Sequence, residues 1–195
     1  MDSLPKRMEK FGIKPKEKEQ LLGELETEIL NIDLKNSYSP EITRNILEKL
    51  KSYSKITDPY KHEKEKSNNE LLNRYKEFQQ LVNSSSDPFD TALRLAIAGN
   101  IIDFGPGNHF DVDETIKNVL TSKFAIDDSK QLKSKISKAK TIFYLGDNCG
   151  EIVLDKLFLE TINHPNVWFA VRDKPVLNDV TINEAEEVGI DQVAK

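Results

Sequence analysis

Two short apolar segments late in the chain, 141–145 (TIFYL) and 167–171 (VWFAV), constrain the fold more than any other feature. An amphipathic helix is expected between them, over 151–162, and another near 182–188. Strands that are apolar throughout and alternate with helices are typical of a parallel sheet covered on both faces. We therefore predict an α/β fold in which residues 140–195 form the first βαβα portion of the sheet.

Two parallel strands are too few to bury both faces of a sheet, because typical sheets have about four to six strands. The sequence ends where the next βα unit should begin, and the final residues 189–195 (GIDQVAK) are a candidate approach to a third strand. We expect the sequence to be a fragment, or a natural truncation, of a longer α/β protein. An unusual small sheet resting on the helical region is the alternative.

Residues 1–139 are expected to form a helical region. Apolar residues recur at helical spacing over 16–30, and proline opens a helix after Ser39. A long polar helix is expected from about Tyr60 to Val82, and its mixed-charge stretch KHEKEK is typical of a solvated helix face.

The next helix is apolar nearly all round, which is typical of a buried helix. Small residues at Ala92, Ala96 and Gly99 predict that a neighbouring element packs closely against it. Asn100 and Asp103 are polar exceptions that share one face, since they lie three residues apart.

The composition excludes several classes of protein. A net charge of -5 and a pI of about 5.4 argue against a nucleic-acid-binding protein. The single cysteine, Cys149, excludes an internal disulfide and a cysteine-cluster zinc site, and His62, His109 and His164 lack metal-ligand spacing. No apolar run approaches the about 18 residues of a membrane span, and the N-terminus lacks the apolar core of a signal peptide. We expect a cytoplasmic protein that binds neither membrane nor nucleic acid.

Polar side chains follow both predicted strands. Asp147 and Asn148 come after the first strand, and Asn178 and Asp179 lie in the loop after the second. Ligands bind beyond the carboxyl ends of parallel strands, and neighbouring strands lie ~4.8 Å apart, so both aspartates could face one crevice. Two carboxylates and a carboxamide suit Mg²⁺ or Mn²⁺. Either pair alone is explained by turn or cap chemistry, but together they favour a metal site.

Other residues near these loops have weaker interpretations. Gly146 and Gly150 flank the first loop, but their spacing gives little support for a dinucleotide site. Glu151 complements the dipole of the following helix, and Arg172 is placed to clamp a phosphate or a carboxylate. Cys149 is better explained as a buried thiol than as a nucleophile.

Four stretches resemble the metal-dependent damage-control phosphatases, the family of domain of unknown function eighty-nine. They are 57–72 (TDPYKHEKEKSNNELL), 96–105 (AIAGNIIDFG), 146–157 (GDNCGEIVLDKL) and 171–181 (VRDKPVLNDVT). The resemblance extends from roughly residue 20 to the end. It implies a helical region beside a Rossmann-like α/β/α domain, a divalent metal (Mn, Mg, Co or Ni), and hydrolysis of phosphate esters of small metabolites such as sugar phosphates.

The resemblance also implies roles for individual residues. Asp147, Asn148 and Asp179 match the family's metal ligands, and either aspartate is a candidate catalytic carboxylate. Asn100, Glu151, Arg172 and Asn178 are the candidate substrate-binding residues; the resemblance places Asn100 at the same cavity and gives Arg172 as a weaker match. Asp58 and Lys64 are weaker matches, for substrate or for holding the two regions together. The choice between water and a carboxylate as nucleophile stays open.

The chain departs from the family pattern in three places. It has no Cys-x-x-Cys segment near its start, and Cys149 stands where alanine is common. It also lacks the later Lys-Gly-x-x-Asn-like phosphate-binding segment and further sheet. The missing portion keeps one alternative open, a non-catalytic remnant that binds metal or a phosphometabolite. A second alternative is an adenosylmethionine-dependent methyltransferase, because the strand, the Gly-Asp-Asn-Cys-Gly loop and the helix loosely resemble an adenosylmethionine loop. Asp173 would be its acidic residue after the second strand.

Overall fold

The computed structural model describes residues 4–33, 35–102 and 111–195. The chain separates into two compact units, residues 1–60 and 61–195, and each is described by itself. None of the described helices is both long and apolar enough to cross a membrane. The chain changes from helices to strands near the predicted division between residues 139 and 140. That this division is also a domain boundary stays a prediction.

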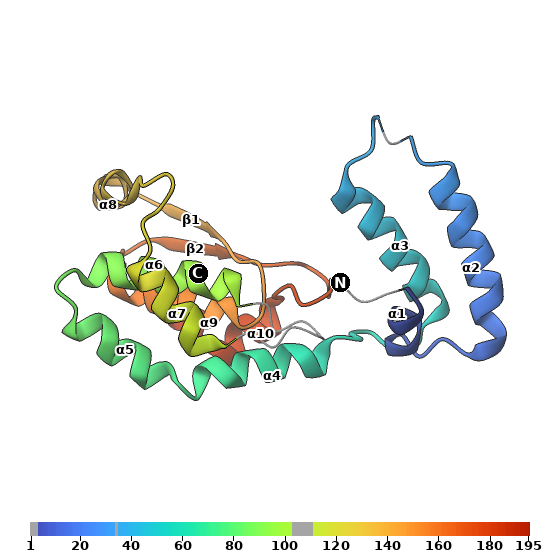
Figure 1. Ribbon diagram of the computed structural model, residues 1–195, viewed down its shortest axis with the longest axis horizontal. Helices are drawn as coiled ribbons and strands as arrows, with labels where there is room; N and C mark the ends of the chain where they lie inside the picture. Colours follow the sequence, from blue (N-terminus) through green and yellow to red (C-terminus); the bar gives the residue numbers. More distant parts are fainter. Residues whose placement is uncertain (1–3, 34, 103–110) are drawn as a thin grey trace. The chain divides into compact units, whose positions relative to one another are not determined.

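The first unit consists of helices. They are α1 (Leu4–Lys10), α2 (Pro15–Leu30) and α3 (Ser39–Tyr53). Helices α2 and α3 pack side by side (Figure 1). Leu21, Leu25 and Leu50 are buried in this unit, and the Lys49 ammonium lies 2.8 Å from the Glu24 carboxylate. The predicted helices over 16–30 and after Ser39 are confirmed.

The second unit contains the remaining elements. They are α4 (Lys61–Leu72), α5 (Tyr75–Ser84), α6 (Pro88–Ile101), α7 (Val112–Thr121), α8 (Ser129–Lys138), β1 (Ile142–Leu145), α9 (Glu151–Ile162), β2 (Val167–Ala170), α10 (Ile182–Val188) and the 3₁₀ turn η1 (Ile190–Gln192). One hydrophobic core runs through this unit, with Leu71, Phe78, Leu95, Ile152 and Leu154 among its most buried members.

The predicted single helix from Tyr60 to Val82 is wrong, because the structure has two helices there. The helical hydrogen bonding stops between α4 and α5, at Asn73 and Arg74. Asparagine has low helix propensity. The Arg74 guanidinium stabilises the break, since it donates to Glu77 at 2.8 Å and also pairs with Asp113.

The prediction that the KHEKEK stretch faces solvent is wrong for Lys64. This side chain is 0% exposed, and its ammonium lies 3.1 Å from the Glu184 carboxylate of α10. A buried charge needs such a partner, because removing it from water costs several kcal/mol. Lys64 therefore belongs to the interior of the second unit.

Helix α6 packs along α9, as its small residues predict. Ala92 and Leu95 are fully buried, and Gly99 lies where α6 meets the first residue of α9. A Cβ atom on Gly99 would lie 3.1 Å from the Cα atom of Glu151, closer than ordinary packing allows. Asp103, the other polar residue expected on this helix, lies outside the described residues.

Replacing Gly99 by alanine is expected to lower the free energy of unfolding by about 1–3 kcal/mol, because the added methyl group meets backbone. Gly23→Ala is the matched control, since Gly23 lies within α2 and has nothing within 4 Å of the added Cβ. That change should instead stabilise by roughly 0.5–1 kcal/mol, the usual gain of alanine over glycine in a helix. Urea unfolding measures both, and equal effects at the two sites would contradict the close packing of α6 on α9.

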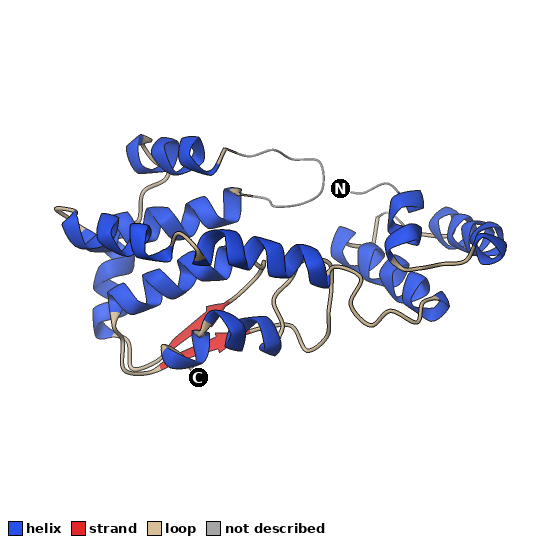
Figure 2. Cartoon of the chain, turned by 90° about the horizontal axis from the view of Figure 1, so that it is seen from below, coloured by secondary structure: helices blue, strands red, loops and turns tan. Residues whose placement is uncertain are grey.

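Strands β1 and β2 form a parallel sheet with Ile142 opposite Val167 and Leu145 opposite Ala170 (Figure 2). The predicted α/β class is confirmed. The other edge of β2 is bonded to Lys195, which donates its N–H to Val167 at 2.9 Å and accepts one from Phe169 at 3.0 Å. The residues 189–195 therefore do approach the sheet.

The sheet is covered on one face only within the described part of the chain. Helix α9 lies on the covered face, where its Asp155 bonds Tyr144 of β1. On the other face Phe143, Leu145 and Trp168 are 69%, 70% and 50% exposed. The prediction that both faces are covered is thus wrong for these residues, because no described helix packs over these side chains.

Candidate metal and phosphate site

Backbone hydrogen bonds join the two loops that follow the strands. Bonds of 2.8 and 2.9 Å connect segment 147–149 to segment 178–180. Asn148 and Asp179 are thereby partners in an antiparallel bridge. Side chains directly opposite each other in such a pair lie on the same side and close together. The two loops that carry the predicted ligands therefore lie side by side.

The end of the sheet fixes where these loops begin. The N–H of Gly146 continues the ladder by donating to Ala170 at 2.9 Å, and that of Arg172 donates to Val180 at 2.9 Å. A Cβ atom on Gly146 would collide with the ring of Phe169. Any larger residue at this position would require the Phe169 ring to move.

Amide groups lie between the carboxylates of the first loop. Asn148 Nδ2 lies 2.9 Å from Asp147 Oδ2 and 3.4 Å from Glu151 Oε2. Asn100 Nδ2 of α6 donates to the same Glu151 oxygen at 3.0 Å. These donors offset the repulsion between carboxylates that lie close together. Asn100, predicted to face the cavity, therefore contacts this loop through Glu151.

Asp179 is held by Arg172. Arg172 Nε donates to Asp179 Oδ2 at 2.7 Å, while the arginine side chain is 58% exposed and that of the aspartate 12%. Burial raises the pKa of Asp179, the Arg172 hydrogen bond partly offsets this rise, and the nearby Asp147 adds to it. The aspartate is thus a partly desolvated carboxylate with one oxygen bonded to a cationic donor.

A cavity of about 250 Å³ opens beside the first loop. Its lining residues are Gly99, Asn100, Ile102, Asn148, Cys149, Glu151 and Asn178. The predicted substrate residues Asn100, Glu151 and Asn178 therefore share one cavity. Asp147, Asp179 and Arg172 are not among its lining residues, although their loops border it. Cys149 is buried and forms no disulfide, as predicted.

The residue types at this edge fit a hard divalent cation. Asp147, Asn148 and Asp179 offer two carboxylates and one amide oxygen, which are the ligands that Mg²⁺ and Mn²⁺ prefer. Among the described residues there is no group of three or more His, Cys, Asp or Glu side chains that could hold a metal. The candidate set differs from such a group because its third member is an asparagine.

Asp155 is a buried acidic residue that the sequence analysis did not identify. Asp155 of α9 is buried, and the Tyr144 hydroxyl donates to its Oδ1 at 2.6 Å. Its Oδ2 has no hydrogen-bond partner in the described ranges. Burial raises the pKa of Asp155 to about 8, the Tyr144 bond lowers it, and the charges of Glu151 and Asp147 raise it further. The signal in the sequence is its position between Leu154 and Leu157, which are both buried.

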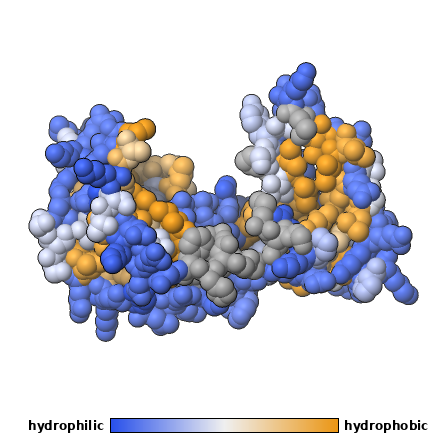
Figure 3. Space-filling model, viewed as in Figure 1, coloured by the Kyte–Doolittle hydropathy of each residue, from blue (hydrophilic) through white to orange (hydrophobic). Residues whose placement is uncertain are grey.

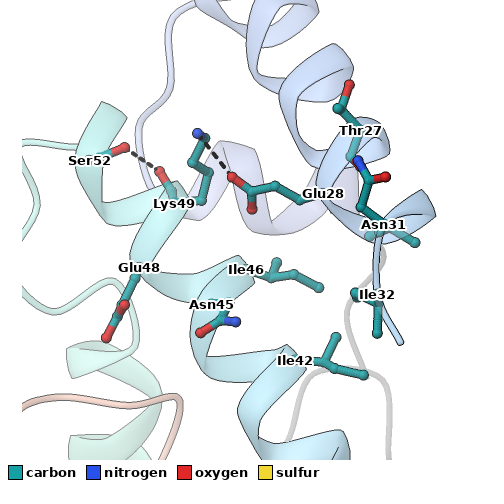
Figure 4. Close-up of a pocket in the computed structure, with 11 residues that line it drawn as sticks. Thr27, Glu28, Asn31, Ile32, Ile42, Asn45, Ile46, Glu48, Lys49 and Ser52 are labelled. Atoms are coloured by element: carbon teal, nitrogen blue, oxygen red, sulfur yellow. Dashed lines mark hydrogen bonds and ion pairs between the residues drawn. The ribbon is translucent and has the colours of Figure 1, made fainter. Parts of the chain in front are cut away.

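A larger groove lies in the first unit. It measures about 730 Å³ and lies between α2 and α3, where Figure 3 shows an apolar surface and Figure 4 its lining. Ile32, Ile42 and Ile46 line it, and Glu28 and Lys49 form an ion pair of 3.1 Å at its side. The Lys49 ammonium of this groove is paired with Glu28, whereas the smaller cavity borders the loops that carry the predicted ligands.

Comparison with known proteins decides the family. The family model described as the damage-control phosphatase ARMT1-like domain matches residues 2–195. The chain belongs to this family. The resemblance seen in its four motifs is thereby confirmed over nearly the whole sequence.

Curated relatives of this damage-control phosphatase-like chain come from archaea. The protein MJ0202 of Methanocaldococcus jannaschii is 33% identical over 153 residues, which are 75% of this chain and 50% of that protein. The damage-control phosphatase PH1575 of Pyrococcus horikoshii is 35% identical over 111 residues, 55% of this chain and 39% of that protein. A damage-control phosphatase of Archaeoglobus fulgidus is 32% identical over 145 residues, 71% and 50% respectively. The chain spans about half the length of these relatives or less.

A solved structure shows the same fold. The crystal structure of the DUF89 family protein PH1575 from Pyrococcus horikoshii superposes with a TM-score of 0.77 and 24% identity. The match covers 96% of this chain and 66% of that protein. The arrangement of helices around the small parallel sheet is therefore that of the damage-control phosphatase-like family.

Proposed function

We propose that this chain carries a metal-dependent phosphomonoester hydrolase site for small phosphorylated metabolites, of the damage-control type. One observation carries the proposal: the backbone pairing of Asn148 with Asp179 joins the two acidic loops beyond the carboxyl ends of the strands. Family membership supports the reaction class, since relatives are named damage-control phosphatases.

Each residue has a role in this proposal. Asp147, Asn148 and Asp179 hold one divalent ion, with Mn²⁺, Mg²⁺, Co²⁺ and Ni²⁺ as candidates. When bound, such an ion neutralises charge on the phosphoryl oxygens and lowers the pKa of water. Asp147 or Asp179 would accept a proton from the attacking water as the alcohol leaves phosphorus. Alternatively, one of these carboxylates would attack phosphorus itself, release the alcohol, and form an aspartyl phosphate that water then hydrolyses. Asn100, Glu151 and Asn178 orient the organic part of the substrate in the cavity that they line.

The test is a metal-dependent assay on the chain. We expect hydrolysis of p-nitrophenyl phosphate with added Mn²⁺ or Co²⁺, its loss with EDTA, and its recovery when the metal is returned. Calorimetry on the same sample measures the stoichiometry and affinity for Mn²⁺. No metal binding and no turnover would together refute the proposal.

A second candidate function is binding of metal or phosphometabolite without turnover. The backbone bridge between Asn148 and Asp179 supports it, since the paired loops hold the candidate metal ligands by themselves. Stoichiometric Mn²⁺ binding without hydrolysis would select this candidate. The methyltransferase alternative gains no support from the family, and the exposed Asp173 would be its acidic residue.

Arg172 is proposed to bind the phosphate. Its Nε bonds Asp179, while its other guanidinium nitrogens have no hydrogen-bond partner among the residues that the structure describes. Arg172→Gln should weaken inhibition by inorganic phosphate about tenfold or more, because a hydrogen bond to a charged group contributes about 1.5–3 kcal/mol. Lys174→Gln is the control, since Lys174 is exposed in the same loop. Equal inhibition constants for the two variants would contradict this role.

A further inference from the structure

Helix α4 holds both ligand-bearing loops, through two polar side chains that face the interior. Lys64 and Asn68 are four residues apart and so lie on one face of the helix. They are 0% and 3% exposed, in a helix whose other face is strongly charged. Burial of a lysine and an asparagine costs free energy unless their polar atoms form hydrogen bonds or ion pairs. Both side chains have such a partner at the start of another helix.

Asn68 contacts the first loop. Its Oδ1 accepts a hydrogen bond of 2.6 Å from the N–H of Gly150, the residue that precedes α9. Gly150, the N-cap residue of α9, has no side chain that could cap the helix, and its own N–H is satisfied from α4. Gly150 is two residues beyond Asn148 and three beyond Asp147. The Nδ2 of Asn68 has no partner within the described residues, so its oxygen is the atom that the fold uses.

Lys64 is linked to the second loop through Glu184 of α10. Its ammonium lies 3.1 Å from Glu184 Oε1, while Oε2 of the same carboxylate accepts the N–H of Thr181 at 2.9 Å and its hydroxyl. This capping box begins α10 two residues beyond Asp179. Burial alone would raise the pKa of Glu184, but the bonds from Thr181 and Lys64 outweigh it and the pKa is lowered. Glu184 is therefore held as a carboxylate.

We infer that Lys64 and Asn68 are positioning residues, which set the spacing of the two metal-binding loops by fixing the starts of α9 and α10 to one rigid helix. Helix α4 packs against both α9 and α10. Groups that orient metal ligands typically change metal affinity by roughly 10–100-fold when they are removed. The inference rests on the proposed metal site, and it adds two residues that touch neither metal nor substrate.

The test uses Lys64→Met and Asn68→Leu in the full chain, with controls on the same helix. Lys66 and Asn69 are exposed residues of the same types, so Lys66→Met and Asn69→Leu are matched controls. We expect both interior changes to weaken Mn²⁺ binding by about tenfold or more, measured by calorimetry. Both controls should stay within about twofold, as is usual for exposed positions.

A second control separates positioning from loss of stability. Val82 is buried in α5, so Val82→Ala should lower the melting temperature without changing the Mn²⁺ affinity. If Asn68→Leu or Lys64→Met does not fold, Asn68→Ala and Lys64→Gln replace them with the same expected result, because neither adds bulk. Affinities equal to those of Lys66→Met and Asn69→Leu would overturn the inference.

Amide hydrogen exchange tests the inference independently of metal. Asn68→Leu should speed exchange at the Gly150 amide by about tenfold or more, because that amide loses its acceptor. Lys64→Met should have a similar effect at the Thr181 amide, because its acceptor, Glu184, loses the ammonium that holds it. If the unmodified chain binds no Mn²⁺, the metal site fails, while faster exchange still supports the positioning role. Unchanged exchange at both amides would overturn it.

Discussion

Exchanging Asp179 for asparagine is expected to weaken Mn²⁺ binding by roughly 100-fold, because the number of charged ligands dominates the affinity of oxygen sites for hard cations. The change keeps the shape of the side chain, and the backbone bridge to Asn148 does not involve it. Any metal-dependent hydrolysis should be lost to the same extent. Calorimetry and the p-nitrophenyl phosphate assay measure the two effects.

The same exchange should not lower stability. The pKa of Asp179 is raised, so the folded state disfavours the charged carboxylate. The free energy of unfolding therefore decreases as the pH rises above the ordinary pKa range of aspartate and this group loses its proton. A neutral isostere avoids this cost, and the melting temperature without metal should stay level or rise. Asp173→Asn, in an exposed part of the same loop, is the control and should leave metal affinity unchanged. Full Mn²⁺ affinity in Asp179→Asn would exclude Asp179 as a ligand.

Removal of the Tyr144 hydroxyl is expected to lower the free energy of unfolding by about 1–3 kcal/mol, because Tyr144→Phe leaves a buried carboxyl group without its hydrogen-bond donor. The bond that is lost joins β1 to α9, the two elements on either side of the loop that carries Asp147 and Asn148. Tyr38→Phe is the control, since Tyr38 is 76% exposed. Urea unfolding at pH 7 measures the difference, and equal stabilities would contradict the buried bond.

The acid that receives this bond should make stability depend on pH. The pKa of Asp155 is raised to about 8 in the folded chain, so the folded form holds a proton that the unfolded form releases at about pH 4. Stability from this group is complete at low pH and falls between about pH 4 and 8, by at most about 1.4 kcal/mol per pH unit. Asp155→Asn should remove this slope. Identical pH profiles of unfolding for the two proteins would contradict the raised pKa.

The sequence was sufficient for the α/β class because period and composition change together at residue 141. Apolar runs predict β1 and β2, and the helix between them was predicted with the bounds that the structure shows. Polar residues placed after both strands predict the neighbouring loops, since parallel strands end at one edge. The bridge between Asn148 and Asp179 could not be predicted, because the spacing of apolar residues carries no information on the conformation of loops.

Polar residues in the interior were the main failure of sequence reasoning. Lys64, Asn68 and Asp155 are buried, and each was assigned to a solvent-facing or unremarked position because polar residues in helices usually face water. Their partners, Glu184, Gly150 and Tyr144, are distant in sequence or lie on other elements. The residue pattern within a single helix does not show which residues of other elements will lie against it. The hint for Lys64 and Asn68 was their place in the family motif over 57–72, and the hint for Asp155 was its place between Leu154 and Leu157.

The bare face of the sheet also provides a natural optical probe. Trp168 is the sole tryptophan of the chain and lies half-exposed on that face, with the Lys195 ammonium 5.7 Å from its ring. Indole emission shifts to shorter wavelength when water is displaced from the ring. Intrinsic fluorescence will therefore report any polypeptide or lipid that covers these strands, without a label and without interference from a second indole.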